Sequence, residues 1–286
     1  MRRQPLPPDG HTHTQWSWDA GSGSMEGSCA RAVDLGLPAI AFTEHVDAVR
    51  WAVPTASAQA MRRRGFDVGA DGRFEPGPLD VDGYLESIER CRERFPDLRI
   101  LTGAELGEPH WFPDQTRSLL ARAAFERVLG SVHSIEFAGR PGATDDLLGP
   151  TAPEGLRPQE VVRRYLSEVL ALLTSDTEIA VLAHVDFPFR HWPTDAGEVG
   201  VAAFEEEFRA VLGELAGSGR ALEVNTRIPL DADVVRWWAE VGGRAVTFGS
   251  DAHEPTSVGH GFEQAAAMVV AHGFGPGPDP HTVWTR

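Results

Sequence analysis

Cysteine is scarce in this chain, and lysine is absent. Only Cys29 and Cys91 occur among the 286 residues, far apart and on separate predicted helices. Two isolated cysteines exclude the disulfide framework of a small secreted protein and a cysteine-rich zinc site, so we expect two buried free thiols in a reducing compartment. All 26 basic side chains are arginine, which leaves no lysine for chemistry that requires a primary amine.

Long hydrophobic runs are also missing. No segment approaches the roughly 20 apolar residues that span a bilayer. The first ten residues, MRRQPLPPDG, contain two arginines but no apolar stretch of the kind that a signal peptide needs. We therefore expect a soluble, cytoplasmic protein that does not associate with a membrane.

The chain has fewer basic than acidic side chains, 26 against 42, which gives a net charge of -16. Such a balance disfavours a nucleic-acid partner, because phosphate backbones are bound mainly by arginine and lysine. Divalent metal ions would reverse the sign of the charge locally, so a small phosphorylated substrate stays compatible with the composition. The hydrophobic content of 42% suffices for a substantial core.

Short apolar segments alternate with amphipathic segments along most of the chain. This order predicts a parallel, barrel-like α/β fold in a single domain, without an internal repeat. The predicted strands are 8–13, 39–43, 99–103, 127–132, 179–183, 221–225 and 245–249. The predicted helices are 29–35, 84–95, 115–125, 158–175, 201–215, 232–241 and 264–271. Two long connections, 46–81 and 138–158, are expected to overhang the site and to select the substrate.

Histidine and carboxylate side chains occur in short groups at the carboxyl ends of predicted strands. The groups are Asp9-Gly10-His11-Thr12-His13, Glu44-His45, Glu105, His133, His184-Val185-Asp186 and Asp251-Ala252-His253. Parallel barrels carry their active sites at that rim, and imidazole and carboxylate are ligands of first-row transition metals. The joint position of the groups therefore predicts a multinuclear metallohydrolase.

As an ordered set, these motifs resemble those of the polymerase and histidinol phosphatase (PHP) superfamily, and most of all its stand-alone histidinol-phosphatase-type members. The shared motifs are DGHTH at 9–13, TEH at 43–45, GAE at 103–105, GSVH at 130–133, AHVD at 183–186 and GSDAH at 249–253. The resemblance implies a distorted (β/α)7, TIM-like barrel that holds three divalent metal ions, with zinc, manganese and iron as candidates.

The resemblance also implies which residues bind each ion. The ligands of the first ion would be His11, His13, Glu105 and Asp251. The second ion would share Glu105 and bind His133 and His184, and the third would bind His45, His253 and Asp19. Asp19 stands where the family often has histidine, and its harder oxygen donor favours manganese, iron or magnesium over zinc at the third site. The sequence leaves open whether Asp19 or the nearby Glu26 is this ligand.

The activity that the resemblance implies is phosphomonoester hydrolysis, with L-histidinol phosphate as substrate, a reaction of histidine biosynthesis. Metal clusters of this type activate water for in-line attack on phosphorus. Asp186 and His253 are the candidate proton carriers for the leaving alcohol. Arg190 and Arg227 are the candidate cations for the substrate phosphate.

Three other functions compete with this interpretation. The same metal site could act on a nucleotide or another phosphoester. An amidohydrolase also uses a His-x-His pair on a barrel, but it usually needs a lysine carbamate, which this chain cannot supply. A barrel that has lost its activity and only binds metal would have lost several ligands, whereas only position 19 departs from the pattern. The oligomeric state is not predicted.

Overall fold

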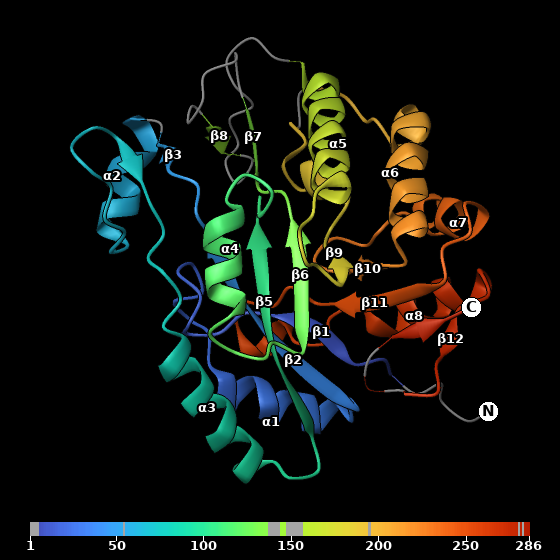
Figure 1. Ribbon diagram of the computed structural model, residues 1–286, viewed down its shortest axis with the longest axis horizontal. Helices are drawn as coiled ribbons and strands as arrows, with labels where there is room; N and C mark the ends of the chain where they lie inside the picture. Colours follow the sequence, from blue (N-terminus) through green and yellow to red (C-terminus); the bar gives the residue numbers. More distant parts are fainter. Residues whose placement is uncertain are drawn as a thin grey trace.

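A nine-stranded sheet forms the centre of the protein (Figure 1). The computed structural model describes residues 6–53, 55–136, 144–146, 157–193, 196–279, 281 and 283–286. Seven strands of the sheet pair in parallel, in the order β1-β2-β5-β6-β9-β10-β11. They are β1 (Asp9–Thr12), β2 (Ala39–Asp47), β5 (Arg99–Gly107), β6 (Arg127–Ser131), β9 (Val181–Leu182), β10 (Ala221–Asn225) and β11 (Ala245–Gly249). Beyond β11, β13 (Trp284–Thr285) and β12 (Gly275–Pro276) add antiparallel pairs.

The sheet curls until its first and seventh parallel strands meet. The amide of Asp251 donates to the carbonyl of His11 at 2.9 Å, and the amide of His13 donates to the carbonyl of Ala252 at 2.8 Å. Thr12 and Ala252 also form a parallel bridge. The carboxyl ends of the strands consequently face one rim, and the predicted parallel, barrel-like α/β architecture is confirmed.

Helices alternate with the parallel strands, as the sequence predicts (Figure 1). They are α1 (Met25–Leu35), α3 (Val81–Arg94), α4 (Pro113–Leu120), α5 (Pro158–Thr174), α6 (Glu205–Ser218), α7 (Ala232–Glu240) and α8 (Phe262–Ala271). Short 3-10 turns occur at η1 (Phe187–His191), η2 (Val201–Phe204) and η3 (Pro255–Ser257). None of the helices in the described ranges is long and apolar enough to cross a membrane. Cys29 and Cys91 are buried and free.

Several elements differ in length from the prediction. Among the helices, α4 ends at Leu120 and not at 125, and α1 begins at Met25 and not at 29. β2 and β5 each continue four residues further than predicted, because they pair with each other in register over all nine positions. Glu44, His45 and Glu105 therefore lie within strands and not just beyond them. β9 is shorter than predicted, with only Val181 and Leu182 in strand conformation.

The predicted loop 46–81 contains regular structure, which corrects the sequence-based expectation. It holds β3 (Trp51–Ala52), α2 (Thr55–Arg63) and β4 (Arg73–Phe74), and β3 pairs with β4. The segment folds because it buries a small core of its own, made of Val49, Trp51, Ala58, Val68 and Phe74. The α2 part of this segment lies to one side of the barrel strands (Figure 1).

The other long connection is described only in part. Within 138–158, Thr144–Asp146 forms β8, which pairs with β7 (Ser134–Glu136), and Pro158 begins α5. Residues 138–143 and 147–156 lie outside the described part of the chain, so the expectation that this connection overhangs the site stays untested.

Candidate metal centre

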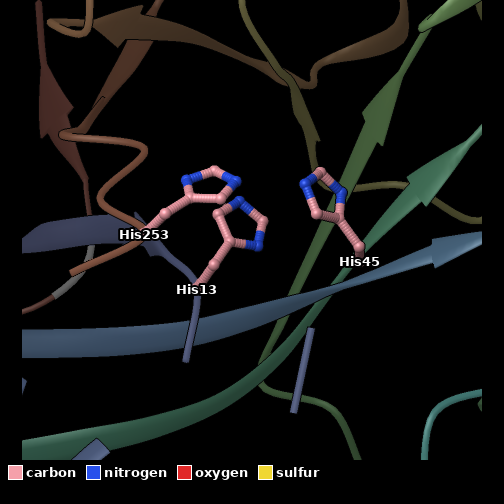
Figure 2. Close-up of side chains that lie close together, drawn as sticks. All are labelled: His13, His45 and His253. Carbon is pink, nitrogen blue, oxygen red and sulfur yellow. The ribbon is translucent and has the colours of Figure 1, made fainter. Parts of the chain in front are cut away.

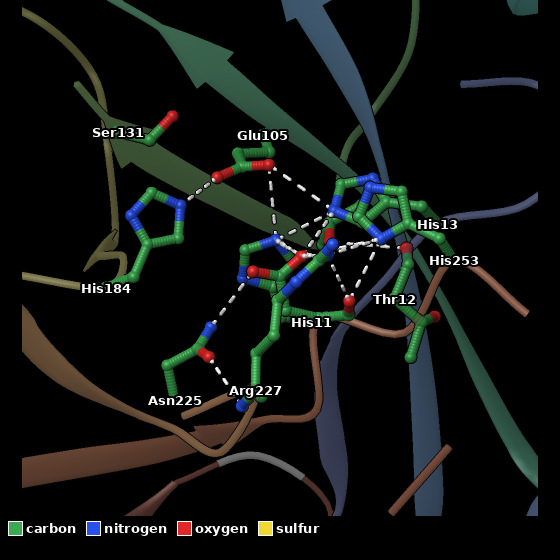
Figure 3. Close-up of polar contacts among 12 residues, drawn as sticks. His11, Thr12, His13, Glu105, Ser131, His184, Asn225, Arg227 and His253 are labelled. Atoms are coloured by element: carbon green, nitrogen blue, oxygen red, sulfur yellow. Dashed lines mark hydrogen bonds and ion pairs between the residues drawn. The ribbon is translucent and has the colours of Figure 1, made fainter. Parts of the chain in front are cut away.

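The first group of candidate ligands comes from β1, β5 and the turn after β11. His11 and His13 face each other with their Nε2 atoms 2.9 Å apart. Oε2 of Glu105 lies 3.2 Å from Nε2 of His11 and 3.4 Å from Nε2 of His13. Oδ1 of Asp251 lies 3.5 Å from Nε2 of His13. Two imidazoles and two carboxylates thus surround one point. Figure 3 shows His11, His13 and Glu105 of this group.

Glu105 joins this group to a second one. Its Oε1 lies 2.6 Å from Nε2 of His184 and 3.3 Å from Nε2 of His133. Its Oε2, on the side of His11 and His13, also lies 3.1 Å from Nδ1 of His45. The Glu105 side chain has no exposed surface. One carboxylate therefore contacts imidazoles from four different strand ends, the position that a bridging ligand occupies.

The third group lies next to His13, on the side where the rings of His45 and His253 approach the His13 ring (Figure 2). Asp19 belongs to it, because its Oδ2 lies 3.0 Å from Nε2 of His253 and 3.5 Å from Nε2 of His45. Glu26 lies instead on α1, where its exposed side chain pairs with Arg94 at 3.2 Å. Of the two carboxylates that the sequence leaves open, Asp19 is the one in the cluster.

Eight of the nine predicted ligands, all except Asp19, fall in sets of donors that could hold a metal ion. Four sets of three donor residues have their ligand atoms within 4.8 Å of one another. Several of these buried donor atoms accept or donate no hydrogen bond: Asp19 Oδ1, His45 Nδ1, Glu105 Oε2 and His184 Nδ1. Buried polar atoms are nearly always partnered in proteins. A cluster of unpartnered nitrogen and oxygen donors is the chemistry that a cation satisfies.

Without a metal ion, the electrostatics favour the ligand forms of only some side chains in the cluster. Burial lowers the pKa of His11 and His45, but the carboxylates beside them outweigh it and hold those pKa values well above their usual range. Burial, together with the nearby rings of His45 and His253, holds the pKa of His13 well below its usual range. Burial is also the main reason that the pKa of His184 is lowered. Burial raises the pKa of Glu105, but the surrounding imidazoles outweigh it and hold that pKa well below its usual range. Neutral imidazole and ionised carboxylate are the forms that bind metal.

Glu223 is a functional residue that sequence reasoning missed. Its Oε1 lies 2.6 Å from Nδ1 of His11, and its Oε2 accepts hydrogen bonds from the His184 amide at 2.8 Å and from Asn225 Nδ2 at 3.0 Å. A carboxylate that accepts from Nδ1 of a histidine leaves Nε2 free as a ligand and fixes the ring. The available signal was an acidic residue in the middle of the apolar strand 221–225.

Asp47 plays the same part for a second histidine. Its Oδ1 lies 2.9 Å from Nδ1 of His133. Since Asp47 follows His45 by two positions in β2, both side chains face the same side of the sheet. That spacing was the signal in the sequence. Behind His13, Ser17 lies 3.1 Å from Nδ1 and donates to Glu44 at 2.6 Å.

A two-lobed cavity opens over the cluster. The larger lobe has a volume of about 850 Å³ and extends past Ser257 and His260, and the smaller has about 580 Å³ and reaches His133 and His184. The residues common to both lobes are Trp18, Asp19, Arg64, Phe66, Arg227, Asp251 and His253. A small molecule could therefore contact the cluster and extend toward solvent.

The predicted substrate-binding arginines both border this cavity. Arg190 lines the smaller lobe and donates from Nη1 to Asp251 Oδ2 at 2.6 Å, while its buried Nε and Nη2 have no partner. Arg227 lines both lobes, is 48% exposed, and places Nη1 3.4 Å from Asp251 Oδ1. Within the described part of the chain, Arg190 thus keeps two buried donors without a hydrogen-bond partner next to the cluster.

The two predicted proton carriers are placed differently. His253 lines both lobes of the cavity. Asp186 is buried and lines neither lobe. Burial raises the pKa of Asp186 to about 6, against the opposing charge of Arg190. A small molecule in the cavity can therefore reach His253, whereas Asp186 lies outside both lobes.

Comparison with known proteins places this geometry in a family. The PHP domain model matches residues 9–227. A probable histidinol-phosphatase from Thermotoga maritima is 33% identical, covering 93% of this chain and 92% of the relative, and one from Clostridium acetobutylicum is 27% identical, covering 91% and 92%. The crystal structure of histidinol phosphate phosphatase from Lactococcus lactis, complexed with zinc, L-histidinol and phosphate, superposes with a TM-score of 0.76 at 22% identity over 95% of each chain. This likeness confirms the predicted distorted barrel, and the chain belongs to the PHP domain family.

Proposed function

We propose that this protein is a metal-dependent phosphomonoesterase that hydrolyses L-histidinol phosphate to L-histidinol and phosphate. The relatives named as probable histidinol-phosphatases match the chain over more than nine-tenths of its length. The observation that carries the proposal is the combination of the buried donor cluster with Arg190, which lines the smaller lobe of the cavity and, among the described residues, has two donors without a hydrogen-bond partner. Such a pairing suits an anion that must be held against metal ions.

We further propose that the cluster holds three divalent ions, with zinc, manganese and iron as candidates. The first would bind His11, His13, Glu105 and Asp251, the second Glu105, His133 and His184, and the third Asp19, His45 and His253. Close distances within each set support this division. Bound divalent ions would supply an acidified water and neutralise phosphoryl oxygens.

The chain's own residues would orient the ester. Nε and Nη2 of Arg190 can donate to two phosphoryl oxygens, because the carboxylate of Asp251 holds Nη1 and fixes the plane of the guanidinium. Burial lowers the pKa of Arg190, but the charges of Asp251 and Asp186 outweigh it and raise that pKa. Asp186, which lines neither lobe, would then act as a positioning residue. His253 lines the cavity, where a leaving alcohol can approach it, but as a ligand of the third ion it could carry a proton only if its Nδ1, 3.0 Å from the Asp251 carbonyl, were released.

The proposed activity predicts the outcome of a phosphate-release panel. Protein purified without chelator is expected to release phosphate from L-histidinol phosphate faster than from nucleotides or sugar phosphates. Removal of metal by a chelator should abolish this release, and adding back zinc, manganese or iron should restore it. Faster turnover of a nucleotide would favour the alternative phosphoester substrate, and full activity in metal-free protein would contradict the proposal.

Asp19 is expected to tune the choice of metal at the third site. Asp19→His should shift the metal preference toward zinc, since imidazole is a softer donor than carboxylate and removes a negative charge. Activity and bound metal would be measured for both proteins over a series of divalent ions. Glu26→Gln is the matched control, because Glu26 pairs with Arg94 away from the cluster. Identical metal profiles for wild type and Asp19→His would refute the assignment.

A further inference from the structure

The segment 46–81 places Arg64 at the cavity. Neither the sequence motifs nor the candidate metal centre assigns a role to this arginine. Helix α2 ends at Arg63, and its next turn places Arg64 and Phe66 on the walls of both lobes. The Phe66 ring packs edge-on against Trp18 at 6.0 Å and Phe74 at 5.5 Å. The guanidinium of Arg64 lies 5.3 Å from the centre of the Phe66 ring. Aromatic packing thus holds Arg64 at the cavity.

The three consecutive arginines of this segment have different surroundings. Arg62 donates to the carbonyls of Val68 at 3.0 Å and Gly69 at 2.8 Å, so it stabilises the turn after α2. Arg63 is exposed and lines neither lobe. Arg64 alone of the three borders the cavity, and within the described part of the chain it forms no ion pair.

The cavity contains two further arginines, Arg190 and Arg227, and Arg64 differs from them in having no acidic partner among the described residues. Arg190 and Arg227 both contact the carboxylate of Asp251, at 2.6 Å and 3.4 Å. Among the described residues, no carboxylate pairs with Arg64, which lines both lobes. A phosphomonoester dianion at the cluster would therefore meet an uncompensated positive charge at Arg64.

We propose that Arg64 is a further phosphate-binding residue, which completes a three-arginine recess with Arg190 and Arg227. The inference rests on the proposed phosphomonoesterase function. An arginine suits this position, because its planar fork can donate two hydrogen bonds to phosphoryl oxygens while its face rests on an aromatic ring. The segment 46–81 then takes part in binding the phosphoryl group, which every substrate of the site shares. The positive charge of Arg64 favours a dianionic phosphomonoester over a monoanionic phosphodiester.

Calorimetric titration of the metal-loaded protein with inorganic phosphate tests this role. Arg64→Gln is expected to weaken phosphate binding about tenfold or more, the size of effect found for hydrogen bonds to charged groups. Arg64→Lys should be intermediate, because it keeps the charge and loses the fork. Arg63→Gln is the matched control and should bind phosphate like wild type. In the ester assay, Arg64→Gln should raise KM more than it lowers kcat, since the contact is made in both the ground state and the transition state.

The possible outcomes separate this inference from the proposed function. Equal phosphate affinity in wild type and Arg64→Gln, with unchanged thermal unfolding, overturns the role of Arg64 and leaves the phosphomonoesterase proposal intact. Equal losses in Arg63→Gln and Arg64→Gln overturn it too, because they would show a general effect of surface charge. A wild-type protein that neither binds phosphate nor hydrolyses any monoester contradicts the proposed function, and the role of Arg64 falls with it.

Discussion

Replacement of Glu105 by alanine is expected to abolish turnover and to remove more than one metal ion per chain. Its two carboxylate oxygens face different imidazoles, with Oε1 near His133 and His184 and Oε2 near His11 and His45. Removal of a residue that binds a single ion would lower the affinity of the protein for that ion alone. Loss of a bridging carboxylate also leaves two cations without the negative charge between them.

Metal content per chain and phosphate release measure this effect. Glu105→Gln keeps the volume of the side chain, so a matching loss in that variant assigns the effect to the charge and not to a cavity. Metal-free wild type is the reference for folding, because loss of the ions can lower the unfolding temperature by itself. Near-normal activity, or the loss of a single ion only, would show that Glu105 does not bridge.

The sequence was sufficient to predict the parallel α/β barrel and the residues that gather at its rim. His11, His13, Glu105 and Asp251 could be found because each follows or ends an apolar run, and parallel strands align their carboxyl ends. The same rule gave strand ends that were too early in β2 and β5. Polar side chains such as Glu44 and Glu105 look like strand terminators in a sequence, whereas the barrel interior buries them within the strand.

The residues that could not be predicted depend on contacts between distant segments. Asp47 contacts His133 across 86 positions of the chain, and its spacing from His45 indicates only which side of the sheet it faces and not this partner. The arginines at 62–64 look alike in the sequence, and only the fold of 46–81 separates the one at the cavity from its neighbours. That fold was missed because Trp51, Phe66 and Phe74 do not form a periodic pattern, yet they pack together.

Glu223→Gln is expected to weaken metal binding roughly 10- to 100-fold, the usual consequence of losing a carboxylate behind a histidine ligand. Glu223 accepts hydrogen bonds through both oxygens, at His11 Nδ1 and at the His184 amide. A glutamine of the same shape would keep its oxygen toward the two donors at the Oε2 side, the His184 amide and Asn225 Nδ2, so its NH₂ group would face His11 Nδ1 and that contact would be lost. Burial raises the pKa of Glu223, but the His11 charge outweighs it and lowers that pKa, so the carboxylate that is replaced is ionised.

Competition with a chromogenic chelator would give the affinity for each ion in turn. The weakened ion should be the one bound by His11, and Asp47→Asn should instead weaken the ion bound by His133, because Asp47 contacts that ring. Glu240→Gln is the control for removing an acidic charge, since Glu240 pairs with Arg209 on the surface. If all three variants bound metal like wild type, the carboxylates of Glu223 and Asp47 would have no role in orienting the histidine ligands. A selective loss in Glu223→Gln and Asp47→Asn, at different ions, would establish that each one orients its own ligand.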